Sequence, residues 1–478
     1  MGYEEGDDWV VKSMTTGYPR FYVHKNVQSL AAEVVHRFGT PEDSATLFPS
    51  PKTAARCYQF FMSKLSDSES QRVRTVNLVM PESAAQKDHS NDDGVPTVRS
   101  GLFCVLYPKE HAGIAKQVWQ HTGEGVSSRR AEFCLSALLD GHLVEETKRG
   151  LAEASQKLHK GPRRYQKTDT VGNSGTAAGE HKQRRHSEQQ SPVEVRESSQ
   201  FIEERFGRNL SLSLANNAKL AVRRRIAGTL AADSDLPEAL ETESSNPRVP
   251  DLTEDDVYLF PSGMSAIFNT HQFLLSTRGP MKSICFGFPY IDTLKILQKW
   301  GPGALFYGKG SSEDLDDLEQ RLKSGERFLA LFTEFPGNPL LNSPDLERIR
   351  ELANRYDFAV VVDESIGNFI NVNVLAPADV VVSSLTKIFS GDSNVMGGST
   401  VLNPAGQYYR RLKDTMAKEY EDNYWAEDAI FLERNSRDFV SRIERINTSA
   451  EVLTSLLKNS GLRMSTRRFP LRIFSVRY

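Results

Sequence analysis

Two reactive side chains each follow a run of apolar, β-branched residues. Asp363 comes directly after AVVV, and Lys387 comes after DVVVSSLT, which also carries the hydroxyl groups of Ser383, Ser384 and Thr386. A lysine amine can bond covalently to an aldehyde, and a neighbouring acid can keep a heterocyclic nitrogen protonated. Each side chain alone fits a solvated strand end, whereas together they form a candidate site.

The start of a helical pattern after the apolar run at 257–260 is a third candidate feature. The residues Pro261, Ser262, Gly263 and Met264 lead into this pattern, and small residues at a helix start leave backbone N–H groups available to an anion. An ordinary helix start explains this segment equally well when it is taken alone. Combined with the amine, the acid and the hydroxyls, it predicts a site for a phosphorylated aldehyde cofactor.

The elements that must position these groups are short apolar runs that alternate with amphipathic helical patterns from residue 255 onward. Continuous Val, Ile and Phe runs between helices are typical of parallel strands covered on both faces. We therefore predict an α/β fold with the ligand beyond the carboxyl ends of the strands. One of the helical patterns is PDLERIRELANRY at 344–356. For this helix we expect Ser343 as the N-cap and Pro344 at the first helical position. The predicted strands lie at 257–260, 283–288, 304–307, 328–335, 358–365 and 378–387.

The composition is that of an ordinary soluble globular protein. The 478 residues are 39% hydrophobic and 25% charged, with a net charge of −3, which argues against a nucleic-acid binder. Four cysteines without a CxxC pair argue against a disulfide framework and a zinc site, so we expect buried thiols and no metal. The sequence shows neither a membrane-spanning run nor a signal peptide, which predicts a cytoplasmic protein.

These motifs resemble the Cys/Met-metabolism family of pyridoxal-phosphate (PLP) enzymes, and most closely its fungal transsulfuration members. The resemblance implies the aspartate-aminotransferase-like (type I) fold, with a large domain of mostly parallel sheet and helices on both faces. It covers residues 201–455 and rests on SSLTKIFSG around Lys387, VVDES around Asp363, EFPGNP at 334–339, SGMSA at 262–266 and PYIDT at 289–293.

The resemblance implies a role for each candidate site residue. Lys387 would bind the cofactor aldehyde and transfer protons, Asp363 would pair with the pyridine nitrogen, and Tyr290 would stack on the ring; these three are the predicted catalytic residues. Asn338 would donate a hydrogen bond to the ring hydroxyl. The phosphate would lie on the amides of Gly263 and Met264, the hydroxyls of Ser384 and Thr386, and the guanidinium of Arg208.

The resemblance also implies a reaction and an assembly. The reaction would be a γ-replacement that joins an O-acylhomoserine and cysteine to give cystathionine; a related lyase or an O-acylhomoserine sulfhydrylase is the alternative, because all share the cofactor apparatus. In this family the segment matching Phe206-Gly207-Arg208 reaches across subunits and carries a tyrosine where Phe206 stands. We therefore expect a homodimer or homotetramer with small amino-acid substrates and no nucleic-acid or membrane partner.

The end of the chain at Tyr478 raises a further alternative. Family members continue into a C-terminal domain that carries an arginine for the substrate α-carboxylate, and the small C-terminal domain looks truncated here. The residues at 456–478 form a divergent tail that resembles none of the family's segments. A truncated, catalytically impaired homologue is therefore an alternative to an active enzyme.

The remaining sequence divides into two segments. Residues 161–200 contain few apolar side chains and predict a disordered polar linker, which separates an N-terminal extension at 1–160 from the catalytic region. LFPSPKTAA at 47–55 partly matches LFPSGMSAI at 259–267, which indicates either a degenerate internal α/β repeat or a chance match. Because Pro51 stands where the second segment has glycine, we expect no cofactor site in the extension.

Overall fold

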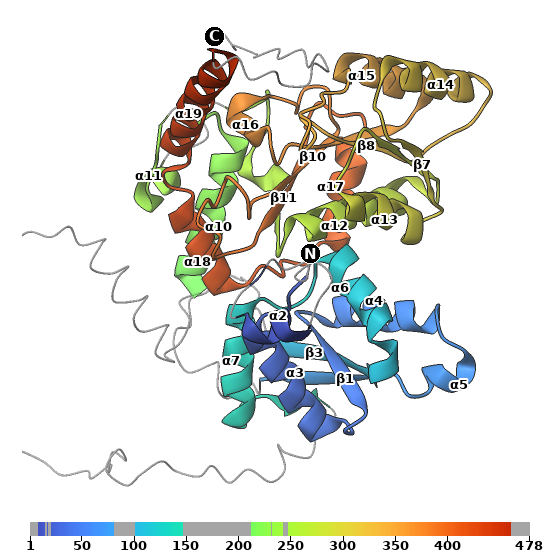
Figure 1. Cartoon of the computed structure of the whole chain (residues 1–478), viewed down its shortest axis with the longest axis vertical. Coiled ribbons are helices and arrows are strands. Elements are labelled where there is room, and N and C mark those ends of the chain that lie inside the picture. The colour runs from blue at the N-terminus through green and yellow to red at the C-terminus, as the bar shows by residue number, and fades with distance from the viewer. Residues whose placement is uncertain are drawn as a thin grey trace, which may run out of the picture.

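The described part of the chain forms two lobes that pack against each other (Figure 1). The N-terminal lobe comprises residues 21–80 and 101–146, and the C-terminal lobe comprises residues 212–230, 232–241 and 247–459. The predicted linker, Arg208 and residues 460–478 of the predicted tail lie outside the described residues. The computed structural model describes residues 8–14, 17, 21–80, 101–146, 212–230, 232–241 and 247–459.

The N-terminal lobe is built on an antiparallel sheet with the strand order β1-β3-β2-β4. The central strand β3 (Gly101–Pro108) is buried along its whole length. Its alternate side chains pack into two apolar clusters, one with α3 (Lys25–Phe38) and α7 (Ser128–Leu139), the other with α4 (Pro51–Met62) and α6 (Ala112–Thr122). The other elements of this lobe are β1 (Asp43–Phe48), α5 (Asp67–Ser70), β2 (Arg74–Val79) and β4 (Val144–Glu145), and the short helix α2 (Asp8–Ser13) precedes it in the chain.

The C-terminal lobe is built on a seven-stranded sheet with the order β5-β11-β10-β9-β8-β6-β7. Strand β11 (Gly398–Leu402) runs antiparallel to both neighbours, and the remaining pairs are parallel. The predicted, mostly parallel α/β fold is therefore confirmed, whereas β11 was not predicted. The other strands are β5 (Val257–Phe260), β6 (Ser283–Phe286), β7 (Ala304–Tyr307), β8 (Ala330–Glu334), β9 (Ala359–Asp363) and β10 (Val380–Ser384).

Helices cover both faces of this sheet. One apolar cluster joins the sheet to α12 (Gly263–Arg278), α13 (Ile291–Lys299) and α17 (Tyr409–Glu419). The opposite cluster joins it to α10, α14, α15 and α18. The central strands are therefore buried on both sides, as their continuous apolar runs predicted, whereas Phe306 in the edge strand β7 is exposed. The bounds are α10 (Leu212–Ala227), α11 (Leu236–Glu241), α14 (Ser312–Lys323), α15 (Leu346–Tyr356), α16 (Asn368–Asn371) and α18 (Ala426–Asn435).

The predicted N-cap of α15 is wrong by two residues. The helix begins at Leu346, and the side chain of Asp345 accepts a hydrogen bond from the N–H of Arg348 at 3.0 Å. Pro344 lies before the helix, where it is buried. A carboxylate that caps the first turn outweighs the preference of proline for the first helical position.

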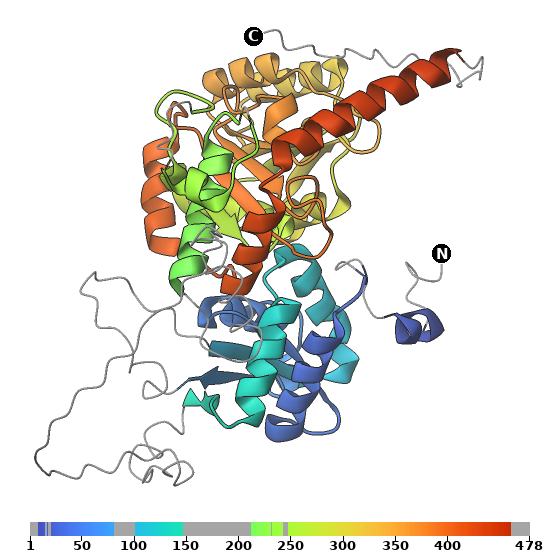
Figure 2. The same cartoon turned by 90° about the vertical axis from the view of Figure 1, so that its left-hand side faces the viewer.

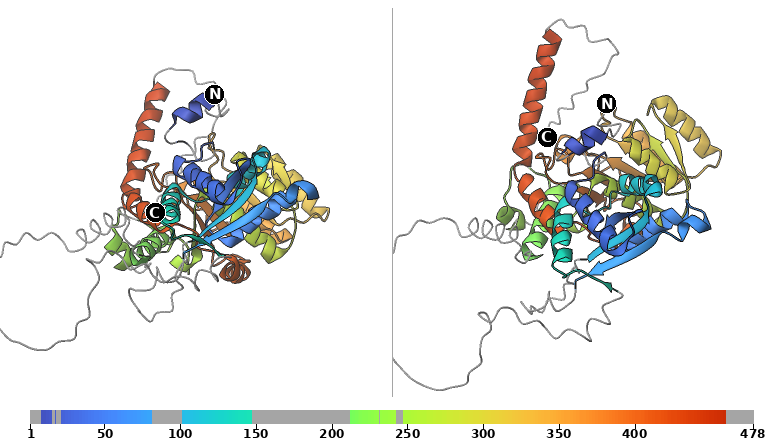
Figure 3. Two further views of the ribbon diagram at one scale, coloured as in Figure 1. Left: turned by 90° about the horizontal axis from the view of Figure 1, so that it is seen from below. Right: turned by 60° about the horizontal axis from the view of Figure 1, so that its bottom comes forward.

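The last helix, α19 (Phe439–Asn459), extends away from the body of the molecule (Figures 2 and 3). Its first turns are anchored by the buried side chains of Phe439 and Ile443, whereas Leu453 and Leu456 are exposed. Residues 456–459 of the segment interpreted as a divergent tail are the end of this helix. Among the helices of the described ranges, α19 included, we find none with the length and apolar character to cross a bilayer.

The two LFPS segments both run from a strand into a helix. Strand β1 leads through Ser50 into α4, strand β5 leads through Ser262 into α12, and each serine is the helix N-cap. The surrounding sheets differ, because all pairs around β1 are antiparallel, whereas the second sheet is mostly parallel. The internal repeat stays a prediction.

Candidate active site

Three adjacent parallel strands bring candidate residues to one edge of the C-terminal sheet. Asp363 is the last residue of β9, Glu334 is the last residue of β8, and the two are register partners. Ser384 is the last residue of β10, the neighbour of β9 on the other side. Lys387 follows it within a tight turn, in which its N–H donates to the carbonyl of Ser384 at 3.3 Å.

The end of β9 is tied to the end of β10 by Ser365. The N–H of Ser365 donates to Asp363 Oδ1 at 2.9 Å, and its own hydroxyl accepts the N–H of Ser384 at 2.6 Å. Burial raises the pKa of Asp363 above its ordinary range, although the hydrogen bonds from Ser365 oppose the shift. A cation placed beside Asp363 would stabilise its ionised form, as the proposed pairing with a protonated ring nitrogen requires.

The start of α12 approaches β10 so closely that only glycine fits. A Cβ at Gly263 would lie 2.7 Å from the Cβ of Ser384. The hydroxyl of Ser262 caps the helix by accepting the N–H of Ser265 at 3.1 Å, and the amides of Gly263 and Met264 belong to the helix start, where N–H groups lack intrahelical acceptors. This turn fits a phosphate, because its backbone N–H groups lie at the positive end of the helix dipole.

The segments that carry Tyr290 and Asn338 meet at Glu334. The N–H of Tyr290 donates to Glu334 Oε1 at 2.5 Å, and the N–H of Asn338 donates to Glu334 Oε2 at 3.4 Å. Burial and the neighbouring charge of Asp363 raise the pKa of Glu334 to about 7. Glu334 therefore holds both predicted ring-contacting residues beside the acid that would face the ring nitrogen.

Glu334 is the site residue that the sequence analysis missed. It stands at the start of the quoted EFPGNP motif, and the rule that found Asp363 applies to it equally, since both are acids at the carboxyl end of a buried strand. Its role was not visible in the motif, because the role depends on two backbone N–H groups from separate segments.

Thr386 and Arg208 differ from the other candidates. The Thr386 hydroxyl donates to the carbonyl of Gly397 at 3.2 Å and accepts the N–H of the same residue at 3.1 Å. To donate to a phosphate, this hydroxyl must first release the Gly397 carbonyl. Arg208 lies outside the described residues, so its contact with the phosphate stays a prediction.

The candidate residues fit a phosphorylated, cationic ring. The turn at Gly263 offers amides for a phosphate, the half-buried Asp363 offers a negative charge, and Lys387 has an exposed side chain for reaction with an aldehyde. Glu334 binds the Tyr290 segment, and Ser365 links Asp363 to Ser384, which lies against the start of α12. The chemistry of these residues therefore fits pyridoxal phosphate, and their individual contacts with it stay predictions.

Comparison with known proteins gives two family matches and several similar sequences. Residues 26–127 match the N-terminal domain of fungal trans-sulfuration enzymes, and residues 250–471 match the Cys/Met metabolism PLP-dependent enzymes. A cystathionine γ-synthase of Neurospora crassa is 51% identical over 97% of this chain and 77% of its own length. A cystathionine γ-synthase-like enzyme of Amanita muscaria is 39% identical, covering 96% of this chain and 71% of its own.

A further relative, a cystathionine γ-synthase of Saccharomyces cerevisiae, is 36% identical over 95% of this chain and 76% of its own length. These similarities extend over nearly the whole chain, including the lobe that carries the candidate site. They confirm the resemblance inferred from the motifs. The chain therefore belongs to the Cys/Met-metabolism family of pyridoxal-phosphate-dependent enzymes.

Proposed function

We propose that this protein joins an O-acylhomoserine and cysteine to give cystathionine. In this γ-replacement the bond from Cγ to the acyl oxygen breaks, the cysteine sulfur bonds to Cγ, and the acyl group leaves as a carboxylate. The observation that carries the proposal is the single sheet edge that presents Lys387, Asp363 and the glycine-restricted start of α12. The relatives named cystathionine γ-synthase support the choice of reaction.

Most of the residues at this edge would bind the cofactor, and Lys387 would also transfer protons. The amides of Gly263 and Met264 and the hydroxyl of Ser384 would hold the phosphate, with Arg208 and Thr386 as further candidates. Tyr290 would lie on the ring face, Asn338 at the ring hydroxyl and Asp363 at the ring nitrogen. When bound, pyridoxal phosphate supplies an electron sink for the substrate α-carbon.

Lys387 would act as the acid–base group. Its side chain is exposed at the end of β10, where the amine can take the α-proton of the substrate and deliver a proton toward the β-carbon. Proton transfer by a positioned side chain typically contributes about 10²–10⁴-fold to the rate. Removal of this amine removes both the covalent attachment of the cofactor and the proton transfer.

The test uses the full chain supplied with pyridoxal phosphate, as wild type and as Lys387→Ala. The wild type should develop the visible absorption of a lysine-bound cofactor and form cystathionine from an O-acylhomoserine and cysteine, detected by mass spectrometry. Lys387→Ala should show neither. Homocysteine formed from sulfide but not cystathionine from cysteine would assign the sulfhydrylase alternative, a keto acid would assign the lyase alternative, and a bound cofactor without product would identify an impaired homologue.

We further propose that the protein works as at least a homodimer. Four exposed apolar side chains lie in the two segments that carry Tyr290 and Asn338. An apolar group beside a site is typical of a surface that another subunit covers. Light scattering should therefore give at least twice the mass of one chain. The four side chains are Phe288 at 58% exposure, Ile291 at 47%, Leu340 at 51% and Leu341 at 55%.

We also propose that the protein resides in the cytoplasm. Cys57, Cys104, Cys134 and Cys285 are all buried and unpaired, which is typical of a reducing compartment. Burial raises the pKa of the Cys285 thiol to about 12, so this thiol stays protonated and unreactive at neutral pH. Fractionation of cells that express the chain tests this placement.

A further inference from the structure

The start of α12 also contacts the N-terminal lobe. The Ser262 hydroxyl has two partners: it accepts the N–H of Ser265 at 3.1 Å and donates to the carbonyl of Gly123, also at 3.1 Å. Gly123 is the C-cap of α6 in the N-terminal lobe. The residue that caps α12 is thus bonded directly to the other lobe.

The contact at Gly123 is a close backbone contact. Gly123 has φ of +60°, and a Cβ there would lie 2.9 Å from the nitrogen of Ser265 and 3.0 Å from the Cβ of Met264. The same Cβ would also collide with the Ser262 hydroxyl. The N-terminal lobe therefore touches the turn whose amides are the proposed phosphate ligands.

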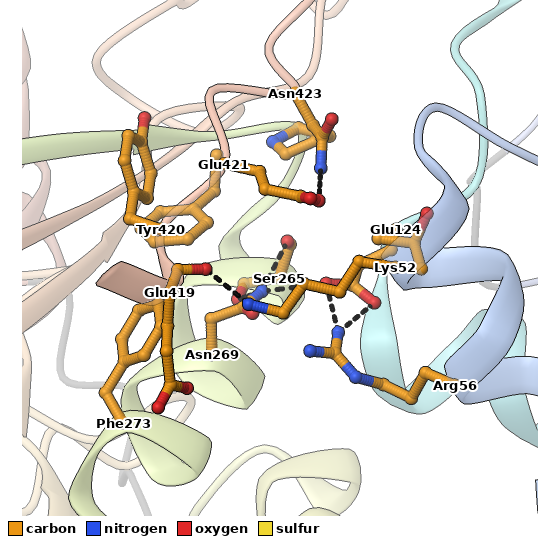
Figure 4. A pocket seen from close by; sticks show the side chains of 13 residues that line it. Lys52, Arg56, Glu124, Ser265, Asn269, Phe273, Glu419, Tyr420, Glu421 and Asn423 are labelled. Atoms are coloured by element: carbon orange, nitrogen blue, oxygen red, sulfur yellow. Dashed lines mark hydrogen bonds and ion pairs between the residues drawn. The ribbon is translucent and has the colours of Figure 1, made fainter. Parts of the chain in front are cut away.

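Glu124 adds a second contact further along α12. Its carboxylate is nearly fully buried and accepts hydrogen bonds from Arg56 at 2.6 Å and from the side chain of Asn269 at 3.0 Å. Asn269 lies on the second turn of α12 and also donates to the carbonyl of Ser265 at 2.9 Å. In Figure 4 these side chains come from both lobes and converge on one pocket.

The end of α6 is itself held in place by the C-terminal lobe. Trp300 stacks on Phe60 with 4.4 Å between ring centroids, and its indole N–H donates to His121 Nδ1 at 3.2 Å. His121 is buried and precedes Gly123 by two residues. Gly123 therefore lies between two residues, His121 and Glu124, that are each hydrogen-bonded to the C-terminal lobe, and these bonds fix the position of its carbonyl.

We propose that the N-terminal lobe is a positioning element for the cofactor phosphate. Gly123 holds the turn from Ser262 to Met264 in the geometry that presents its amides, and Glu124 holds the next turn of α12 through Asn269. The inference rests on the phosphate site assigned under the proposed function. Because coupling between two sites is reciprocal, phosphate binding must also stabilise the contact between the lobes.

Two glycines of the same lobe provide a matched test. Gly123→Ala introduces a Cβ that collides with α12, whereas Gly141→Ala introduces a Cβ with no atom within 4 Å. Both positions have positive φ, +60° and +75°, so both variants carry a similar backbone strain. We expect Gly123→Ala to raise the dissociation constant of pyridoxal phosphate about tenfold and Gly141→Ala to leave it within about twofold of wild type.

The titration follows the visible absorption of the apo-protein as pyridoxal phosphate is added. Pyridoxal, which lacks the phosphate, serves as the second probe and should bind wild type and Gly123→Ala equally. Equal affinities of the two alanine variants for pyridoxal phosphate would overturn the proposal, as would an equal loss for both probes. If the protein binds the cofactor in this manner but forms a product other than cystathionine, the proposed function fails and the inference stands.

Hydrogen exchange of the wild type gives an independent measurement. Addition of pyridoxal phosphate should slow amide exchange in residues 121–126 as well as in residues 262–266, because the two segments are in contact. The short helix α5, in the same lobe, should exchange at an unchanged rate and serves as the control. Slower exchange in 262–266 without any change in 121–126 would overturn the proposal.

Discussion

Glu334 and Asp363 are register partners at the ends of β8 and β9, so their carboxylates project from the same face of the sheet. Burial raises the pKa of both groups, and the charge of Asp363 contributes to the shift of Glu334 to about 7. Two adjacent, half-buried acids that interact this strongly do not ionise independently. A cationic ring beside Asp363 would favour the ionised form of that acid.

Replacement of Glu334 by glutamine should change the pH dependence of stability. The pKa of about 7 in the folded state lies above the ordinary value of 4.5, so the folded protein binds the proton more tightly. The contribution of Glu334 to the unfolding free energy is then complete below about pH 4.5 and is lost as the pH rises toward about 7. Urea denaturation of the apo-protein across this range should show a smaller decrease for Glu334→Gln than for wild type.

A suitable control for this measurement is Glu110→Gln. The side chain of Glu110 is 65% exposed in the N-terminal lobe, so Glu110→Gln removes a carboxylate of the same kind without disturbing the C-terminal sheet. If Glu334→Gln and Glu110→Gln retained the same slope as wild type, Glu334 would not be the group that titrates.

Gly263→Ala should weaken both folding and cofactor binding. The new Cβ would lie 2.7 Å from the Cβ of Ser384, so the helix start or the end of β10 must move. Overpacking of this kind typically costs about 1–3 kcal/mol. Gly113→Ala in α6 is the control, because a Cβ there meets no atom within 4 Å. Urea denaturation and pyridoxal phosphate titration of both variants measure the effect; unchanged binding in Gly263→Ala would show that this turn does not hold the phosphate.

Breaking the buried ion pair between Arg248 and Glu364 should lower the unfolding free energy more than breaking an exposed ion pair. Arg248 Nη2 lies 2.6 Å from Glu364 Oε2, and both side chains are buried. Arg248→Met leaves a buried carboxylate without its cation, which we expect to cost about 3–5 kcal/mol in the unfolding free energy. The double variant with Glu364→Gln should lose less than the sum of the single changes, and strict additivity in this cycle would contradict direct coupling.

An exposed ion pair provides the reference for that cycle. Arg321 and Asp317 lie 2.9 Å apart on α14, with side-chain exposures of 41% and 50%. Exposed ion pairs contribute little to stability, so Arg321→Met should change the unfolding free energy by less than Arg248→Met. Both variants can be compared in one urea denaturation series.

Asp363→Asn should reduce turnover while cofactor attachment persists. The amide removes the negative charge that would stabilise the protonated ring nitrogen, and loss of one such electrostatic contact typically lowers kcat by about 10²–10³-fold. Lys387 is unchanged, so visible cofactor absorption should remain. Asp255→Asn is the control, since the side chain of Asp255 is 81% exposed. Equal rates in the two variants would remove Asp363 from the catalytic group.

The strands of the C-terminal lobe were predictable because most are continuous apolar runs between helices. Strand β11 escaped prediction because its sequence, GSTVL, contains glycine, serine and threonine in place of such a run. Gly398 is required there by tertiary packing, since a Cβ would collide with the carbonyl of Ser262. The pattern along the chain carries no sign of this contact.

The place of Asp363 at the end of a strand was predictable, because one residue follows one apolar run, whereas Lys387 lies three residues beyond the end of β10. The contacts of Glu334 were not predictable from the sequence, because they depend on strand register and on N–H groups of two other segments. The bond between Ser262 and Gly123 was likewise not predictable, since it joins residues 139 positions apart. The N-terminal sequence offered glycines but no indication that one of them faces α12.

The shared hydroxyl of Ser262 limits how the two halves of this chain can evolve. A recombinant that took residues 26–127 from one parent and the remainder from another would need a glycine in the first part and a short hydroxyl side chain in the second. A substitution at either position changes which replacements the other tolerates. The contact between the lobes therefore restricts which pairs of residues can occupy positions 123 and 262 together.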